Sequence, residues 1–187
     1  PRIDDDNRGR QLSGRGGWKP VPGLAVGASA ARGEFLTRGI GDAAEAIFGK
    51  RSSRQQALGL DAEYSRDHWI VRGEVIDSRW QLPAFGQPAI ETPLRATAAF
   101  VETRYRFTPR YFAAARADRL TFSRVRGAVS FQGQPTPWDA PVTRIEVGVG
   151  VQLQRNLSAR AVVQRNWRDA GRVRTRTFLS GQLAVWF

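Results

Sequence analysis

The sequence has no cysteine and no methionine, and its 187 residues include a single histidine, His68. Without cysteine, a disulfide scaffold, a cysteine-ligated zinc site, a cysteine nucleophile and a haem-attachment motif are all excluded. Lysine is also scarce: Lys19 and Lys50 are the only two, so almost all of the 29 basic residues are arginine. No run of about 18 apolar residues occurs, which excludes a transmembrane helix but not a membrane-spanning β-barrel, whose alternating strands have low average hydropathy.

The composition is strongly basic and moderately apolar. The 29 basic residues face 17 acidic ones, which gives a net charge of +12 and an isoelectric point near 11.5. A hydrophobic fraction of 41% is too high for a disordered tail. We therefore expect one ordinary-sized domain, spanning residues 1–187, that carries a surplus of arginine.

Hydrophobic residues alternate along most of the chain. In 142–154 the apolar residues Ile145, Val147, Val149, Val151 and Leu153 share one face, while Arg144 and Glu146 share the other. Only 41–48 has the pattern of a helix, which Gly49 would end. The alternation predicts an all-β, antiparallel transmembrane β-barrel with about nine strands, near 10–19, 23–36, 56–67, 68–80, 94–107, 110–123, 142–154, 157–169 and 174–187.

The predicted connections alternate between tight and long. Tight turns fall at 19–23, 65–68, 108–110 and 155–158, and long loops near 37–55, 81–93 and 124–141. Short periplasmic turns with long extracellular loops are typical of outer-membrane barrels. Aromatic residues next to both kinds of connection predict two interfacial girdles, with Trp69 and Tyr105 at the turn end and Trp80, Phe122 and Trp167 at the loop end. Phe112 is also assigned to the turn-end girdle.

The C-terminal segment is an alternating strand that ends in an aromatic residue. Leu183, Val185 and Phe187 resemble the C-terminal signature of bacterial outer-membrane proteins, which implies recognition by the barrel-assembly machinery. More specifically, the segments 11–18, 22–29 and 157–167 resemble the C-terminal half of porins, close to the phosphate-selective porin family. The resemblance implies a location in the outer membrane of a Gram-negative bacterium.

The number of predicted strands and the side on which the first one starts indicate whether the barrel is complete. If the last strand ends in the periplasm, every tight turn lies on the periplasmic side and the first strand starts outside the cell. A bacterial barrel normally has an even strand number and a periplasmic N-terminus. Together with the missing initiator methionine, this predicts the C-terminal part of a barrel of about 14–18 strands, with a closed eight-stranded barrel as the alternative.

The polar face of the strands is expected to line a pore. A basic surplus in a narrow aqueous channel attracts anions, so the sequence predicts passive diffusion of small, preferentially anionic solutes. The alternative for each arginine is a cross-strand pair with a carboxylate that only fills the wall. The pore-lining candidates are Arg15, Arg72, Arg104, Arg116, Arg144, Glu146, Arg160, Arg174 and Arg176.

Other functions and partners follow from the same residues. A non-conducting barrel that anchors other components and a nucleic-acid-binding β-barrel remain alternatives, although we expect no nucleic acid as partner. Loop arginines would contact lipopolysaccharide and other outer-membrane lipid, and a homotrimer is expected as an oligomeric option. His68 lies in a predicted turn and no pair of carboxylates stands out, so no catalytic site and no enzymatic activity are predicted. No cofactor and no metal are expected, since Asp4–Asp6 fit a solvated loop better than a calcium site.

Overall fold

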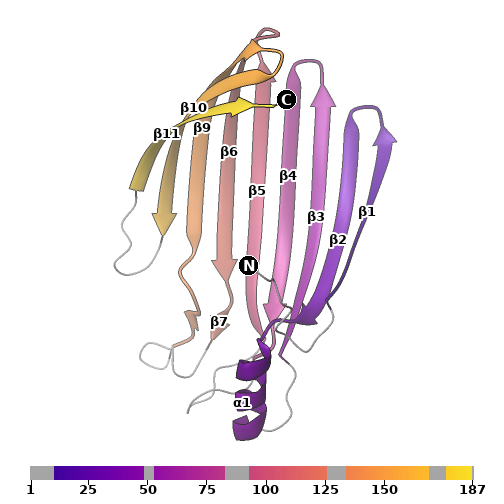
Figure 1. Ribbon diagram of the computed structural model, residues 1–187, viewed down its shortest axis with the longest axis vertical. Coiled ribbons are helices and arrows are strands. Elements are labelled where there is room, and N and C mark those ends of the chain that lie inside the picture. The colour runs from indigo at the N-terminus through magenta and orange to yellow at the C-terminus, as the bar shows by residue number, and fades with distance from the viewer. Residues whose placement is uncertain (1–10, 49–52, 83–92, 126–133, 169–175, 187) are drawn as a thin grey trace.

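The computed structural model describes residues 11–48, 53–82, 93–125, 134–168 and 176–186. These residues form a sheet of nine long antiparallel strands (Figure 1). The strands are β1 (Leu12–Val21), β2 (Leu24–Glu34), β3 (Arg54–Arg66), β4 (Trp69–Trp80), β5 (Leu94–Arg106), β6 (Tyr111–Phe122), β9 (Val142–Gln154), β10 (Leu157–Arg168) and β11 (Arg176–Val185). The nine strands expected from the alternation are all confirmed.

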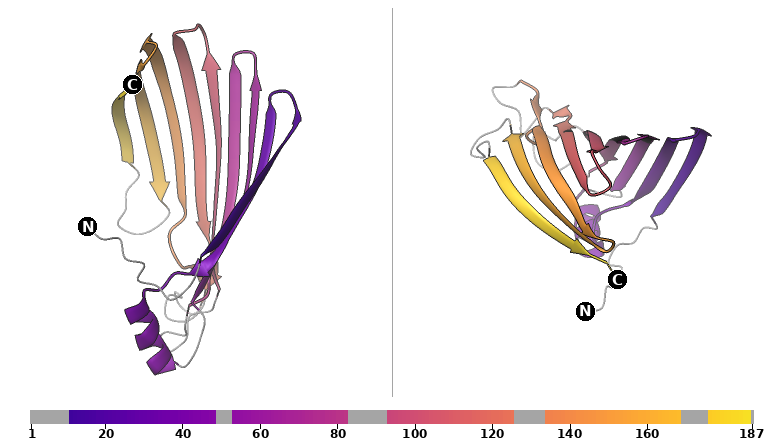
Figure 2. Two further views of the ribbon diagram at one scale, coloured as in Figure 1. Left: turned by 45° about the vertical axis from the view of Figure 1, so that its right-hand side comes forward. Right: turned by 90° about the horizontal axis from the view of Figure 1, so that it is seen from above.

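The strands follow one another across the sheet in chain order. The one departure is the step from β6 to β9, whose connection holds the two-residue strands β7 (Arg124–Val125) and β8 (Thr136–Pro137), paired with each other. The sequence patterns did not predict this small ladder. The nine-stranded sheet curls strongly, so that seen from above it forms part of a barrel wall (Figure 2). Among the described residues, β1 and β11 pair with β2 and β10 but not with each other.

Tight turns and long connections lie at opposite ends of the sheet (Figure 1). The turn after β1 uses Gly23, whose φ of 82° favours glycine and whose carbonyl accepts a 2.7 Å hydrogen bond from the Ser65 N–H. The turn after β3 uses Asp67 at a φ of 52°. We call these two ends the turn end and the loop end. That the turn end is periplasmic remains a prediction, as do the single domain and the extracellular side of the loops.

A helix lies in the connection between β2 and β3. The helix α1 (Arg38–Phe48) begins three residues before the predicted start, and its end agrees with the prediction. In the described part of the chain, no helix has the length and apolar character needed to cross a membrane.

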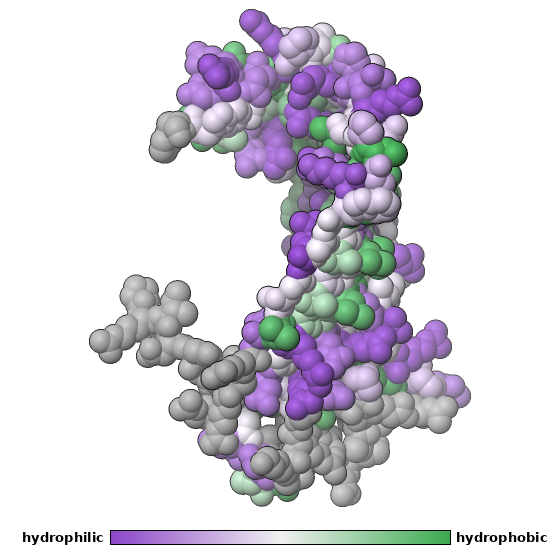
Figure 3. All heavy atoms as spheres, turned by 90° about the vertical axis from the view of Figure 1, so that its right-hand side faces the viewer, coloured by the Kyte–Doolittle hydropathy of each residue, from purple (hydrophilic) through white to green (hydrophobic). Residues whose placement is uncertain are grey.

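The sheet has almost no conventional core. Large apolar side chains remain exposed along the strands. The buried hydrophobic residues among the described ones are Leu94, Ala96, Val125 and Ala140. Leu60 and Val149, for example, are 66% and 61% exposed. Figure 3 shows hydrophilic residues gathered toward both ends of the molecule, with hydrophobic residues concentrated between them. This is the distribution of a wall with a lipid-facing apolar band.

The expected turn-end girdle is observed, whereas only Trp167 of the expected loop-end girdle keeps the outward register. At the turn end, Trp69 lies opposite Tyr105 on the outward face with ring centroids 4.6 Å apart. At the loop end, Trp80 and Phe122 instead occupy the inward register and pack against Trp138 of the β8–β9 connection, with centroids 5.9 and 4.8 Å apart. The loop-end girdle is therefore wrong for Trp80 and Phe122. Their rings pack the β8–β9 connection against the concave face of the sheet.

Candidate functional site

A ladder of alternating charges crosses the concave face of the sheet. Directly paired positions on neighbouring strands share one face, and the register aligns Glu63 of β3, Arg72 of β4, Glu102 of β5, Arg116 of β6 and Glu146 of β9. The charges alternate in sign at every step across these five strands. We call this row the charge ladder.

Ion pairs link four of the five members of the charge ladder. The Arg72 Nε donates to the Glu63 Oε2 at 2.7 Å, and the Arg72 Nη1 lies 3.9 Å from the Glu102 Oε1. Glu102 also accepts a 3.5 Å hydrogen bond from the Arg116 Nη1. Glu102 thus bridges two arginines across three strands, which holds the guanidinium groups close to the wall.

A second row lies next to the ladder, toward the loop end. Asp118 accepts hydrogen bonds of 2.8 Å from the Arg116 Nη2 and of 3.0 Å from the Arg144 Nε and Nη2. Further along the sheet, the Arg15 Nη2 donates to the Asp61 Oδ2 at 2.5 Å. Three of the predicted arginines therefore have carboxylate partners in this region.

Arg104 and Arg160 differ from these paired arginines. No described carboxylate contacts either of them, and the Arg104 Nε is shielded from solvent without a hydrogen-bond partner. The Arg104 guanidinium instead lies over the ring of Phe112, 4.0 Å from its centroid. That ring occupies the space over Gly150, where any larger residue would collide with it.

These groups surround a hollow of about 410 Å³ on the concave face near the turn end. Its charged lining comes from four arginines and two glutamates, and Gln152, Ser158 and Gln182 add neutral polar groups. Phe112, Ile70 and Trp186 supply apolar surface. A small anionic solute would find guanidinium groups there that are not neutralised by the wall. The charged residues of the lining are Arg72, Glu102, Arg104, Arg116, Glu146 and Arg160.

The structure brings most of the predicted pore residues onto one face. Arg72, Arg104, Arg116, Glu146 and Arg160 line the hollow, while Arg15, Arg144 and Arg176 share the concave register farther toward the loop end. Arg174 lies outside the described residues, and so does Phe187 of the predicted C-terminal signal. Leu183 and Val185 face outward, 63% and 57% exposed. The pore-lining role of all these residues remains a prediction.

Sequence reasoning missed the aromatic rings of the concave face. Phe112 was assigned to the lipid girdle because it lies near a turn, which is wrong, and Phe100, which lies 3.9 Å below the Arg116 guanidinium, was not singled out. Both rings occupy positions of the same parity as the neighbouring arginines. The alternation along β5 and β6 therefore predicts that they lie on the concave face.

A loop anchor was also missed. Asp139 of the β8–β9 connection accepts a 2.7 Å hydrogen bond from Arg168 at the end of β10. The backbone N–H of Ala140 and the Arg168 guanidinium together hold the pKa of Asp139 below its ordinary value. This pair ties the connection to the wall at the loop end.

Comparison with solved structures identifies the architecture. OmpT, an outer membrane protein of Vibrio cholerae, matches in its outer-membrane expressed form with a TM-score of 0.65 and 11% identity over 97% of this chain. Its in-vitro folded form and its loop L8 deletion mutant each give a TM-score of 0.64, at 11% and 12% identity, over 98% of this chain. The fold is that of an outer-membrane β-barrel. The predicted location in the bacterial outer membrane is confirmed with it.

The match covers only part of each neighbour. This chain spans 56–58% of the OmpT chains. No family model matches the chain, and no curated protein does. The outer-membrane part of the predicted resemblance is therefore confirmed, whereas nothing singles out the phosphate-selective porin family.

The prediction that the protein is not an enzyme requires correction. The OmpT chains match this chain in fold, at 11–12% identity. A barrel fold hosts many functions and by itself fixes none of them. The likeness thus removes the ground for excluding catalysis, and the exclusion is withdrawn.

Proposed function

We propose that the protein is a porin-like channel for the passive diffusion of small hydrophilic solutes and that it favours anions. The observation that carries this proposal is the composition of the concave face, where arginines outnumber carboxylates and where Arg104 and Arg160 have no described carboxylate partner. Partly neutralised rows beside unpaired guanidinium groups give the wall a net positive potential. Such a potential raises the local concentration of anions and repels cations.

The position of the unpaired arginines supports the same proposal. Both line the 410 Å³ hollow, on a face that the sheet curls around (Figure 2). Arginine is costly on a lipid-facing wall, about 2–4 kcal/mol at the midplane, so its concentration on the concave face fits contact with water. Conduction needs a closed wall, and the protein as isolated from outer membranes is therefore the material to test.

A second candidate is a non-conducting barrel that anchors other outer-membrane components. The charge ladder favours it, since Arg72 and Arg116 are bridged by carboxylates in the manner of a structural wall. Lipopolysaccharide, the barrel-assembly machinery and a trimer of identical subunits are proposed as partners under either function.

Planar-bilayer recording distinguishes the two candidates. The channel proposal expects discrete conductance steps and, in a salt gradient, a reversal potential of the sign given by anion selectivity. A protein that inserts without conductance steps would favour the anchor. Conductance with a cation-selective reversal potential would contradict the charge argument while leaving the channel in place.

A further inference from the structure

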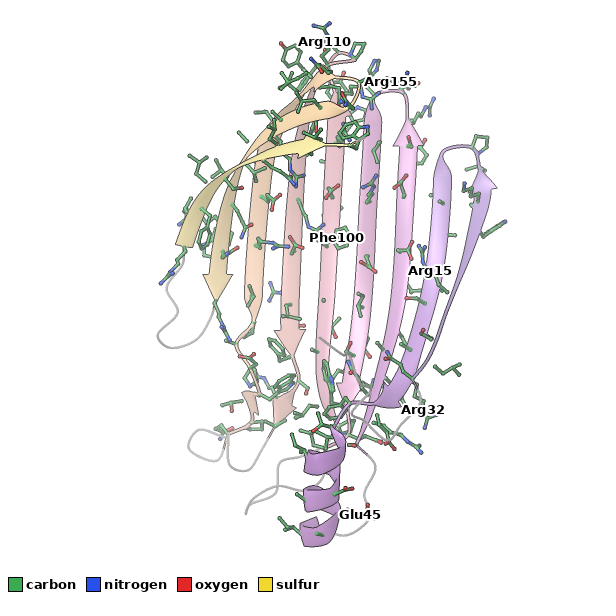
Figure 4. The ribbon with its side chains drawn as sticks, in the orientation of Figure 1. Arg15, Arg32, Glu45, Phe100, Arg110 and Arg155 are labelled. Carbon is green, nitrogen blue, oxygen red and sulfur yellow. The ribbon has the colours of Figure 1, made fainter. Side chains whose placement is uncertain are left out.

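A row of basic residues crosses the convex face of the sheet at the loop end. The register places Arg32 of β2 opposite Gln56 of β3, Gln56 opposite Arg79 of β4, and Arg79 opposite Arg95 of β5. The parity is opposite to that of the charge ladder, so these residues belong to the face that carries Leu58 and Leu60. Figure 4 shows Arg32 at the loop end of β2, far from Arg110 and Arg155 at the turn end. We call Arg32, Arg79 and Arg95 the outer arginine row.

Asp77 fixes the position of two members of this row. Its Oδ2 accepts a 3.1 Å hydrogen bond from the Arg79 Nε, and its Oδ1 accepts a short one from the Arg95 Nε. The Thr97 hydroxyl donates to the same Oδ1 at 3.1 Å. The backbone of Arg95 is held as well, because its N–H donates to the Ser123 Oγ at 3.0 Å and its carbonyl accepts from the Trp138 Nε1 at 2.9 Å.

The consequence is a pair of oriented, partly free guanidinium groups. Asp77 accepts a hydrogen bond from the Nε of each arginine, and their Nη atoms donate no hydrogen bond to a described group. The Asp77 side chain is 17% exposed, whereas those of Arg79 and Arg95 are 50% and 52% exposed. The carboxylate therefore lies beneath the two cations, whose remaining donors face outward. Paired Nη donors match the oxygens of a phosphate group.

An apolar hollow adjoins Arg32 and Arg79 of the outer arginine row. Its volume is about 510 Å³, and it lies where Gly14 and Ala30 leave the convex surface low between Leu12 and Leu58. Arg32, Arg79 and Asp77 line its polar side. A surface with apolar residues on one side and guanidinium groups on the other suits an amphiphile with an anionic headgroup.

We propose that the outer arginine row and this hollow form a binding site for the phosphorylated glycolipid of the outer leaflet, lipopolysaccharide. Its phosphate would lie against the Nη groups of Arg79 and Arg95, and one acyl chain in the hollow. Two arguments favour this occupant. The positive guanidinium groups complement the negative phosphates of the glycolipid. The row also borders the apolar band at the end where the long connections lie, which in outer-membrane barrels is the extracellular side. The site lies on the opposite face from the proposed channel and does not depend on conduction.

Native mass spectrometry of the protein in detergent micelles tests the site on the unmodified protein. The probes are lipid A with its phosphates, the same glycolipid after dephosphorylation, and inorganic phosphate. We expect retention of phosphorylated lipid A at least about tenfold stronger than that of the dephosphorylated form, since phosphate–guanidinium hydrogen bonds are lost. Equal retention of both glycolipids, or displacement of lipid A by millimolar inorganic phosphate, would overturn the proposal.

Substitutions locate the site. They also show whether binding depends on the orientation of the Arg79 and Arg95 guanidinium groups or only on the net positive charge. Arg79→Gln with Arg95→Gln is expected to abolish the preference for the phosphorylated form. The matched control Arg66→Gln removes an arginine that is 72% exposed at the turn end and should retain the preference. Asp77→Asn raises the net positive charge but releases both guanidinium groups, and we expect it to bind several-fold more weakly. Tighter binding by Asp77→Asn, or an unchanged preference in the double variant, would contradict an oriented site.

Discussion

At the scale of single residues, the concave arginines fall into two groups. Arg72, Arg116 and Arg144 donate to carboxylates at 2.7–3.0 Å, so their charges are largely compensated within the wall. Arg104 and Arg160 have no such partner among the described residues. Selectivity should therefore depend on the second group, while the first holds neighbouring strands together.

Replacing the two unpaired arginines tests this division. In the double variant Arg104→Gln with Arg160→Gln, we expect the anion-to-cation permeability ratio to fall about two- to fourfold per charge, from a Coulomb energy of about 0.5–0.8 kcal/mol at 5–8 Å in water. The measurement is the reversal potential across a planar bilayer in a salt gradient. Arg66→Gln, which removes one charge at the exposed turn end, serves as control, and an equal shift per charge removed would show that only net charge matters.

Glu102 offers a change of opposite sign. Its two oxygens contact Arg72 at 3.9 Å and Arg116 at 3.5 Å, so Glu102→Gln removes the negative charge between two positive ones. We expect a higher anion preference in the same recording and a loss of stability of no more than about 1 kcal/mol, because the site is partly exposed. A lower anion preference would contradict the assignment of the ladder to the lumen.

At the scale of strands, the two faces of the sheet formed by β9 and β10 should respond differently to a charge. Val147 lies on the convex face and is 53% exposed, whereas Gln164 of β10 lies on the concave face opposite Glu146. We expect Val147→Arg to cost about 2–4 kcal/mol of the free energy of unfolding from lipid vesicles and Gln164→Arg to cost close to nothing. Comparable costs for the two variants would mean that the convex face does not contact lipid.

The loop anchor predicts a pH dependence at the loop end. The pKa of Asp139 is lowered by the Ala140 N–H and by Arg168, so this contact stabilises the docked connection above the ordinary pKa of an aspartate and is lost as the pH falls through the lowered value. We expect the near-ultraviolet circular dichroism of the neighbouring Trp138 to weaken as the pH falls below the ordinary pKa of an aspartate, about 3.9. Asp139→Asn should already show the weakened signal at neutral pH, and a signal equal to that of the unmodified protein would contradict the anchor.

The strands could be predicted from the sequence because their signal is local. The alternation of Ile145, Val147 and Val149 marks both the strand and its faces, and the observed bounds of β9 are those expected. Contacts across strands depend on register instead. Asp77 meets Arg95 only because β4 pairs with β5 across a connection of 13 residues, and no sequence pattern fixes that pairing in advance. Phe112 lies next to a turn, which favours the lipid-facing girdle, but its even position in β6 places it on the concave face.

At the scale of the whole molecule, a large curved sheet with four buried hydrophobic residues among those described cannot be stabilised by a core of its own. Its exposed leucines and valines need an apolar solvent on the convex side, while its charges need water on the concave side. OmpT of Vibrio cholerae shares the curved antiparallel wall.

Single-cysteine scanning of β9 tests this division most directly, because the chain contains no cysteine and gives no background labelling. Each position from 144 to 153 is replaced in turn except Gly148 and Gly150, where a Cβ would collide with neighbouring atoms, and the membrane-inserted protein is treated with a water-soluble, membrane-impermeant maleimide. We expect a period of two, with strong labelling at the even positions of the concave face and little at the odd positions. Uniform labelling, or labelling of the odd positions instead, would contradict a wall with lipid outside and water inside.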